Sequence, residues 1–168
     1  MRRMLRTTIS PILALALVGL AAVPAAAAGP ERSDIGSFSV DFPAGVLCDF
    51  AVRWEFDAGG HQLVFPVQPN GDQVVRSVGG VTGTITNLDG DRSFPIRGGA
   101  RQDFVFHADG TIDVIINGTV VAGYFPTDVG GPSMWLFRGH LHDEVDGTFT
   151  ATSHSVSGLA TDLCAALT

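Results

Sequence analysis

The chain of 168 residues contains no lysine, so all ten of its basic residues are arginines. Arg2, Arg3 and Arg6 fall within the first 28 residues, whereas all 17 acidic residues come later. Residues 29–168 therefore carry seven positive and 17 negative groups, a net charge of −10 with neutral histidines. Because an acidic surface repels phosphate groups and no basic cluster offsets this charge, we expect neither nucleic acid nor an anionic membrane surface as a partner.

The sequence also lacks the motifs that assemble common catalytic sites. It has no Gly-x-Ser-x-Gly nucleophile elbow, and without lysine it cannot form a Walker phosphate loop. The adjacent Ser153 and His154 do not by themselves indicate a catalytic triad. We therefore predict no catalytic residue and no cofactor, and we favour a protein that is not an enzyme.

Only one long apolar run is present, and it lies close to the N-terminus. Residues 9–23 are almost wholly apolar, follow three arginines and precede the small residues 25–28. This order is typical of a cleavable secretory signal. The run of about 15 residues is shorter than the roughly 20 residues of a spanning helix. We predict a signal peptide at residues 1–28, an extracellular product with no membrane span, a flexible arm at 29–37 and one domain at 38–168.

Cysteine is scarce as well, with only Cys48 and Cys164 in the chain. An exported protein meets an oxidising environment, so an even number of cysteines favours a disulfide. The bridge would close a loop of 116 positions, for which the chain-entropy model gives about 4–5 kcal/mol. The alternative is two buried free thiols.

Helical periodicity is almost absent after residue 37, and alternation with a period of two replaces it. In residues 50–57 Phe50, Val52, Trp54 and Phe56 share one face of a strand, and charged residues occupy the other face. A short helical turn is expected only after Thr161 and Asp162. Further strands are expected at residues 61–68, 73–78, 81–87, 92–97, 101–108, 111–117, 119–125, 133–143 and 148–156.

Glycine is abundant between these segments. Gly-Gly pairs occur at 59/60, 79/80, 98/99 and 130/131, Asp-Gly occurs at 89/90, 109/110 and 146/147, and Asn-Gly occurs at 70/71 and 117/118. These dipeptides favour hairpin turns, and Asn117-Gly118 predicts the clearest one. Pro66 and Pro95 lie inside expected strands, which places those strands at an edge or a bulge. About ten strands joined by tight turns predict an all-β antiparallel meander that closes into a β-barrel, with a two-sheet β-sandwich as the alternative.

Histidine provides the main candidate for metal chemistry, and the Asp89-Gly90-Asp91 turn is a weaker candidate for calcium. His140 and His142 point to the same side of an extended strand, and His107 or His154 could add a third ligand beside Asp143 or Glu144. The simpler interpretation is a solvated strand face, and we predict no metal site. Solvated surface and turn chemistry likewise explain two carboxylate pairs, Glu55 with Asp57 and Asp89 with Asp91.

Three motifs resemble a group of small secreted actinobacterial proteins. They are Thr86-Asn87-Leu88-Asp89-Gly90, residues 125–132 (Phe-Pro-Thr-Asp-Val-Gly-Gly-Pro) and residues 161–167 (Thr-Asp-Leu-Cys-Ala-Ala-Leu). The likeness extends from about residue 48 to residue 167. It implies export and a β-rich domain, and it implies no activity, ligand or site residue.

An aromatic stripe leads to the main functional hypothesis, which is a secreted binding module for a small or apolar ligand. The stripe comprises Phe50, Trp54, Phe56, Trp135 and Phe137, and a β-barrel can enclose a ligand. The residues predicted to bind the ligand are Trp54, Tyr124 and Trp135. The loop at 125–132 either shapes the mouth of a pocket or is a plain connection. A metal-assisted enzyme and an envelope interaction protein are the alternatives, and the oligomeric state stays open.

Overall fold

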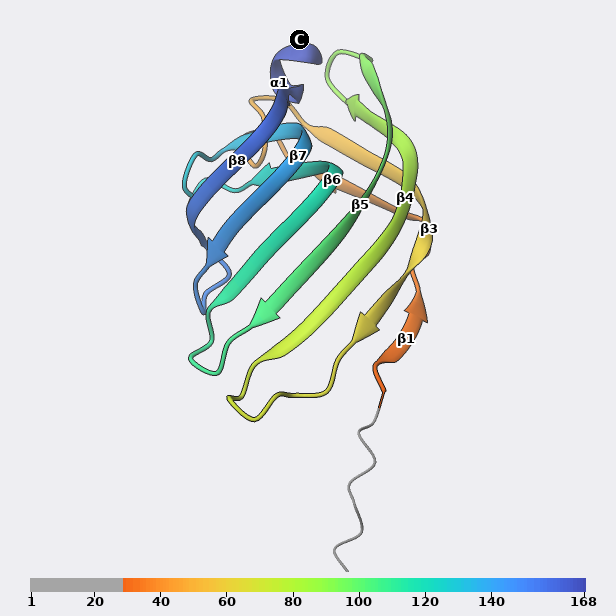
Figure 1. Ribbon diagram of the computed structural model, residues 1–168. Coiled ribbons are helices and arrows are strands. Elements are labelled where there is room, and N and C mark those ends of the chain that lie inside the picture. Colours follow the sequence, from red (N-terminus) through yellow and green to blue (C-terminus); the bar gives the residue numbers. More distant parts are fainter. Residues whose placement is uncertain (1–28) are drawn as a thin grey trace, which may run out of the picture.

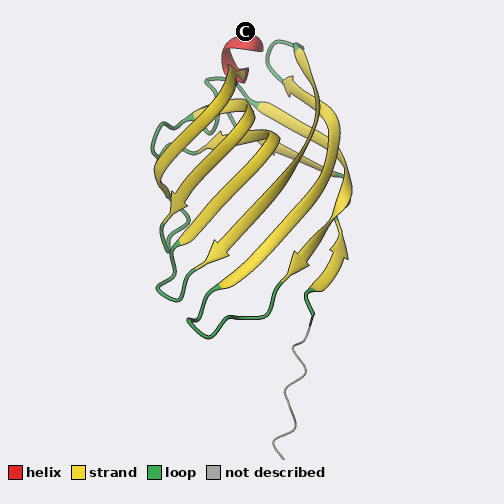
Figure 2. Ribbon diagram, viewed as in Figure 1, coloured by secondary structure: helices red, strands yellow, loops and turns green. Residues whose placement is uncertain are grey.

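The computed structural model describes residues 29–168, so the predicted signal at 1–28 lies outside the described residues. The predicted all-β class is confirmed, because eight strands form one antiparallel sheet that a single short helix follows (Figures 1 and 2). No helix in the described part of the chain is long and apolar enough to cross a membrane. The elements are β1 (Glu31–Asp34), β2 (Phe38–Phe42), β3 (Val52–Val64), β4 (Gln73–Asn87), β5 (Ser93–Phe106), β6 (Ile112–Tyr124), β7 (Ser133–Val145), β8 (Ala151–Asp162) and α1 (Leu163–Ala166).

The prediction of a closed barrel is wrong, and so is the alternative of two separate sheets. The strands are ordered β1-β3-β4-β5-β6-β7-β8, with β2 as a second partner of β3, and β8 pairs only with β7. The sheet therefore keeps two edges. We had expected closure because unpaired edges promote aggregation, but the β3 edge is covered by two short strands instead. Glu31–Asp34, which we expected in a flexible arm, is one of them and pairs with β3.

The long strands β3 to β6 each contain two of the segments that the sequence predicted as separate strands. The Gly-Gly pairs at 59/60, 79/80 and 98/99 lie inside strands, and so does Asn117-Gly118, so none of the four forms a turn. The hairpin turns fall at the other predicted dipeptides, Asn70-Gly71, Asp89-Gly90, Asp109-Gly110 and Asp146-Gly147, so that part of the turn prediction is confirmed. A glycine pair is compatible with both a turn and a bend in a strand.

These strand glycines face one another across neighbouring strands. We call them the glycine line: Gly59, Gly60, Gly79, Gly80, Gly99, Gly118, Gly139 and Gly158. Gly118, Gly139 and Gly158 have φ values of 134°, 141° and 136°, which L-residues with a side chain rarely adopt. A Cβ atom on Gly139 would also collide with the carbonyl oxygen of Ser157. The sheet bends along this line, and a side chain would collide with neighbouring backbone at every position of it except Gly59 and Gly80.

The sheet forks beyond the glycine line, between β5 and β6. These two strands pair only from Ala100 opposite Gly118 to Phe106 opposite Ile112, so residues 93–99 and 119–124 separate. In Figure 1 the first half of β3 and the strand β2 cross behind β5 and β6, which gives two layers at this end. Pro95 lies where β5 has lost its second neighbour, and this agrees with the prediction of an edge position.

The main core fills the space between these two layers, and we call it the disulfide cluster. Val52 and Phe56 of β3, which the alternation predicted to face inward, are 0% and 6% exposed. The predicted Cys48–Cys164 disulfide is present, with its Cα atoms 5.5 Å apart. The buried members are Leu47, Cys48, Phe50, Val52, Phe56, Ile85, Ile96, Met134, Leu136, Leu163 and Leu167.

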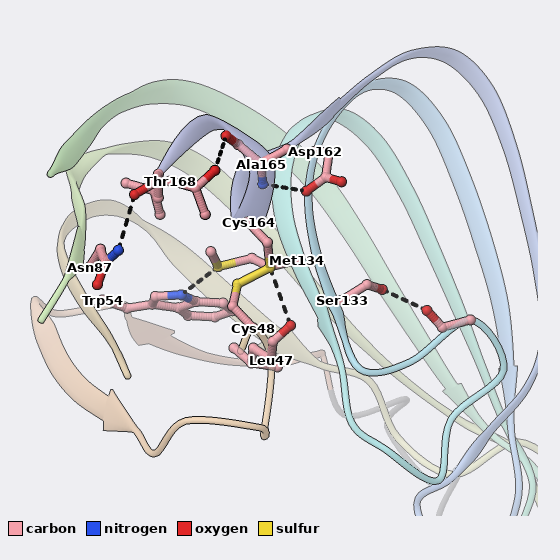
Figure 3. Close-up of a disulfide and its surroundings, with 12 residues drawn as sticks. Leu47, Cys48, Trp54, Asn87, Ser133, Met134, Asp162, Cys164, Ala165 and Thr168 are labelled. Carbon is pink, nitrogen blue, oxygen red and sulfur yellow. Dashed lines mark hydrogen bonds between the residues drawn. A yellow bond between two sulfur atoms is a disulfide. The ribbon is translucent and has the colours of Figure 1, made fainter. Parts of the chain in front are cut away.

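Helix α1 closes this core at the end opposite the β3–β4 turn (Figure 3). Its predicted cap is confirmed, because the Asp162 carboxylate accepts a hydrogen bond from the Ala165 backbone N–H at 3.0 Å. The buried Asn87 side chain donates to the Leu167 carbonyl oxygen at 3.0 Å. Together with the disulfide, these bonds fix the C-terminal segment over the ends of the strands.

Candidate functional site

A second, smaller hydrophobic cluster lies on the other face of β6 and β7, and we call it the Tyr124 cluster. Its buried members are Ile116, Tyr124, Phe137, Leu141 and Ala151, and Trp135 packs against them. Unlike the disulfide cluster, it contains a hydrogen-bonded group of titratable side chains at its border.

That group consists of Tyr124, Asp143 and His154, which come from three adjacent strands. Antiparallel register places Asp143 of β7 directly opposite His154 of β8. The Tyr124 hydroxyl lies 2.9 Å from Asp143 Oδ2 and 2.7 Å from His154 Nδ1, and this nitrogen is 2.6 Å from Asp143 Oδ1. Residues 19 and 30 positions away from Tyr124 are thus joined in one compact network.

The proton positions follow from the donors and acceptors that each group offers. Burial raises the pKa of Tyr124, and the negative charge of Asp143 and the hydrogen bond to it raise the pKa further, so the hydroxyl stays protonated and donates. A carboxylate can only accept, so we assign the proton between Asp143 and His154 to Nδ1 of the imidazole. The Nε2 atom of His154 has no hydrogen bond within residues 29–168 and remains available to another molecule.

A pocket of about 300 Å³ lies against this network. Trp135 and Phe137 stack at 6.3 Å between ring centroids, and the Phe137 centroid is 5.5 Å from that of His154. The lining is mostly apolar, and its polar side chains are those of Tyr124, Ser133 and His154. The lining residues are Tyr124, Val129, Gly130, Ser133, Trp135, Phe137, His154, Val156 and Ala160.

The loop before β7 forms part of this pocket, as one of the two sequence interpretations proposed. Val129 and Gly130 line the pocket. Asp128 holds the loop in place, because its carboxylate accepts hydrogen bonds from the backbone N–H of Phe125 at 2.6 Å and of Ala151 at 2.8 Å. The loop is therefore tied both to its own start and to the first residue of β8.

The structure brings together two of the three predicted ligand-binding residues. Tyr124 and Trp135 share the pocket, whereas Trp54 packs against the disulfide cluster, on the other face of β6 and β7. Its indole N–H points at the Met134 sulfur, 3.1 Å away beneath the disulfide (Figure 3). Trp54 also borders a separate hollow of about 410 Å³ that lies over the glycine line.

Of the histidines considered for metal binding, His154 lines this pocket, whereas His140 and His142 lie on the opposite face of β7. The His140 ring is hydrogen-bonded to the Asn117 side chain at 3.0 Å, and the His142 ring is bonded to Asp113 at 3.2 Å. Between residues 29 and 168 no three His, Cys, Asp or Glu side chains are arranged to hold a metal ion. The solvated strand face that the alternation predicted accounts for both residues.

Asp113 joins His142 to a second histidine on this outer face. Burial alone would raise the pKa of Asp113, but hydrogen bonds from His107 and His142 outweigh it, and the pKa lies below its ordinary value. The hydrogen bond to Asp113, 3.1 Å long, is the main reason why the pKa of His107 is raised, and Asp72 adds to the effect. None of the residues of this network lines the pocket beside the Tyr124 cluster.

The pairing of Asp143 with His154 was missed at the level of sequence. Alternation along residues 133–143 places Asp143 on the same face as Phe137 and Leu141, and a carboxylate on an apolar face is a signal of a buried polar partner. The partner itself could not be identified, because His154 faces Asp143 only through the register of β7 and β8.

Comparisons with protein-family models, curated proteins and solved structures find no match to this chain. The fold and pocket therefore define only a class, a disulfide-bonded all-β domain with one forked, bent sheet. The resemblance to small secreted actinobacterial proteins stays a prediction.

Proposed function

We propose that this protein is a secreted binding protein for a small, mainly apolar ligand that carries one polar group. The observation that supports this proposal best is the position of the Tyr124–Asp143–His154 network at the wall of an apolar pocket. Binding sites of this kind combine apolar and aromatic walls with a few fixed polar groups. The disulfide is compatible with the extracellular location that the predicted signal implies.

The polar group of the ligand would form a hydrogen bond with Nε2 of His154. Asp143 and Tyr124 fix the imidazole through Nδ1, so its orientation costs the ligand little entropy on binding. Trp135 and Phe137 offer an apolar wall on which a flat ring can lie. A single hydroxyl on an aromatic or alicyclic body matches this arrangement.

The test uses the indole N–H signals of the two tryptophans in an NMR spectrum. Trp135 lies in the pocket and Trp54 lies outside it, so the two signals report on different places. We expect 2-naphthol, an apolar ring system with one hydroxyl, to shift the Trp135 signal and leave the Trp54 signal in place. Variants W54F and W135F assign the signals, and native mass spectrometry of protein exposed to culture extract searches for the natural ligand.

A matched pair of variants separates the pocket from the rest of the strand. Ala160→Leu adds bulk to the pocket wall, and Thr161→Leu adds similar bulk to an exposed neighbouring position that does not line the pocket. We expect the affinity for 2-naphthol to fall at least tenfold in A160L and to be unchanged in T161L. Equal binding by both variants, or a shift of Trp54 alone, would refute the proposed site.

One observation also supports a second candidate function, that of a hydrolytic enzyme. A buried carboxylate bonded to Nδ1 of a histidine, with Nε2 free, is the arrangement of a general base. Ser133 is no evident nucleophile, because its hydroxyl donates to the Gly130 carbonyl oxygen at 2.8 Å, so the base would act on water. Hydrolysis of 4-nitrophenyl acetate that is lost in H154Q and retained in H140Q would favour the enzyme. Equal rates in both variants would exclude it.

A further inference from the structure

The hollow over the glycine line differs chemically from the Tyr124 pocket. It is lined by 17 residues, and none of them is Asp, Glu, Arg or His. We call it the charge-free groove: Ile35, Phe38, Trp54, Phe56, Ala58, Gly59, Gln62, Ser77, Gly79, Gly80, Val81, Ala100, Gln102, Phe104, Thr119, Val120 and Val121. In a domain with 17 acidic residues and seven arginines, such a stretch of neutral surface narrows the class of ligand that fits.

The floor of the groove is bare backbone because of the bend in the sheet. Gly59, Gly79 and Gly80 line it, and a Cβ on Gly79 would collide with the carbonyl oxygen of Gly59. The missing side chains leave a volume of about 410 Å³, which is within the range of small-molecule sites. The same glycines that bend the sheet therefore also open the groove.

The two ends of the groove offer different contacts. At one end Phe38 and Phe56 pack with ring centroids 5.3 Å apart, and Trp54 lies 5.9 Å from Phe56. At the other end Gln62 lies opposite Ser77, which lies opposite Gln102, so three polar side chains form a row across β3, β4 and β5. Among the described residues, none of the three has a side-chain hydrogen bond to protein, although all three are partly buried.

These contacts exclude two classes of ligand. A carboxylate, phosphate or ammonium group would lose its hydration without meeting an opposite charge. A pure hydrocarbon would dehydrate the three polar side chains without giving them hydrogen-bond partners, which is unfavourable. Amide and hydroxyl side chains both donate and accept, which complements a neutral ligand rich in hydroxyl groups. We infer that the charge-free groove binds an uncharged carbohydrate, with one face of the sugar on the aromatic rings and its hydroxyls on the row of Gln62, Ser77 and Gln102.

The test again uses the two tryptophan signals, and it is independent of the proposed function. We expect N-acetylglucosamine, glucose or cellobiose at millimolar concentration to shift the Trp54 signal and leave the Trp135 signal unchanged. Glucuronate, which adds one carboxylate, and cyclohexanol, which has a single hydroxyl, should shift Trp54 at least tenfold more weakly than the sugar that binds.

Variants locate the contact within the groove. Gln102→Met and Gln62→Met keep the length of the side chain and remove its amide, and we expect each to weaken sugar binding at least fivefold. Gln68→Met makes the same change at an exposed site that does not line the groove, and should leave binding unchanged. The inference is overturned if none of the three sugars shifts Trp54, if the three variants bind equally, or if the neutral peptide N-acetyl-Ala-Ala-amide shifts Trp54 where the sugars do not.

Discussion

Both hydrophobic clusters include residues of β6 and β7, but the two clusters differ in their exposure to solvent. The disulfide cluster lies between two layers and under α1, and Met134 and Leu163 in it are fully buried. The Tyr124 cluster lies beside the edge strand β8, whose residues after Ala151 are exposed. We therefore expect the disulfide cluster to contribute more to stability than the Tyr124 cluster, which borders the pocket of the proposed function, and the predictions that follow test this difference.

Loss of the disulfide should have the largest effect on stability. For a loop of 116 positions, the double variant C48S/C164S should lower the free energy of unfolding by about 4–5 kcal/mol. Urea unfolding, followed separately through Trp54 and Trp135, measures this change. We expect the Trp54 environment to loosen first, since Trp54 packs against the disulfide cluster. Earlier loss at Trp135 would contradict the assignment of stability to that cluster.

The glycine line should rank second, because both clusters depend on the bend. Gly139→Ala places a side chain at a φ of 141° and against the Ser157 carbonyl oxygen, and it should destabilise the domain by about 2–3 kcal/mol. Gly59→Ala is the matched control within the same line, because nothing lies within 4 Å of its added Cβ. Thermal unfolding of the two variants gives the comparison. Equal loss in both would show that the line does not set the bend.

Tyr124→Phe should have a smaller effect that is confined to the pocket. The change removes one of the two donors to Asp143 and should cost about 1–2 kcal/mol of stability. Because His154 loses its contact with the hydroxyl, we also expect weaker binding of 2-naphthol. Chemical denaturation and NMR titration measure the two effects. Unchanged affinity with lowered stability would assign Tyr124 to packing alone.

The smallest expected effect belongs to the outer histidine network. His107 has a raised pKa in the folded state, so its contribution to stability is complete below about pH 6.5 and is lost as the pH rises through the folded value. Wild-type protein should lose slightly more stability than His107→Asn over this pH interval. NMR titration of the His107 ring should give a midpoint above the ordinary histidine value. A midpoint at or below that value would refute the network.

The local features of the fold could be predicted from the sequence, whereas its bends could not. Alternation predicted that Val52 and Phe56 face the interior. The even number of cysteines predicted the disulfide, and Thr161 with Asp162 predicted the helical turn that Asp162 caps. The glycine pairs were assigned to turns because each was considered alone. Gly60 belongs to a bend because it lies opposite Gly79 of the neighbouring strand, and this pairing depends on the strand register.

The same limit applies to the candidate site. The aromatic stripe was assumed to line a single interior, so Trp54 and Trp135 were expected in one place. The two tryptophans instead lie on opposite faces of the layer formed by β6 and β7, and they belong to different clusters. Tyr124 and Trp135 share a pocket because β6 and β7 pair directly, and Asp143 and His154 join them through the next pairing.

The position of α1 has a consequence for the time at which the domain can fold. Leu163, Cys164 and Leu167 complete the disulfide cluster, yet they follow all eight strands in the chain. A ribosome has therefore synthesised every strand before the residues that seal the core emerge. The chain therefore cannot reach its final stability before its last residues are made, and the Cys48–Cys164 disulfide can form only after all eight strands have been synthesised.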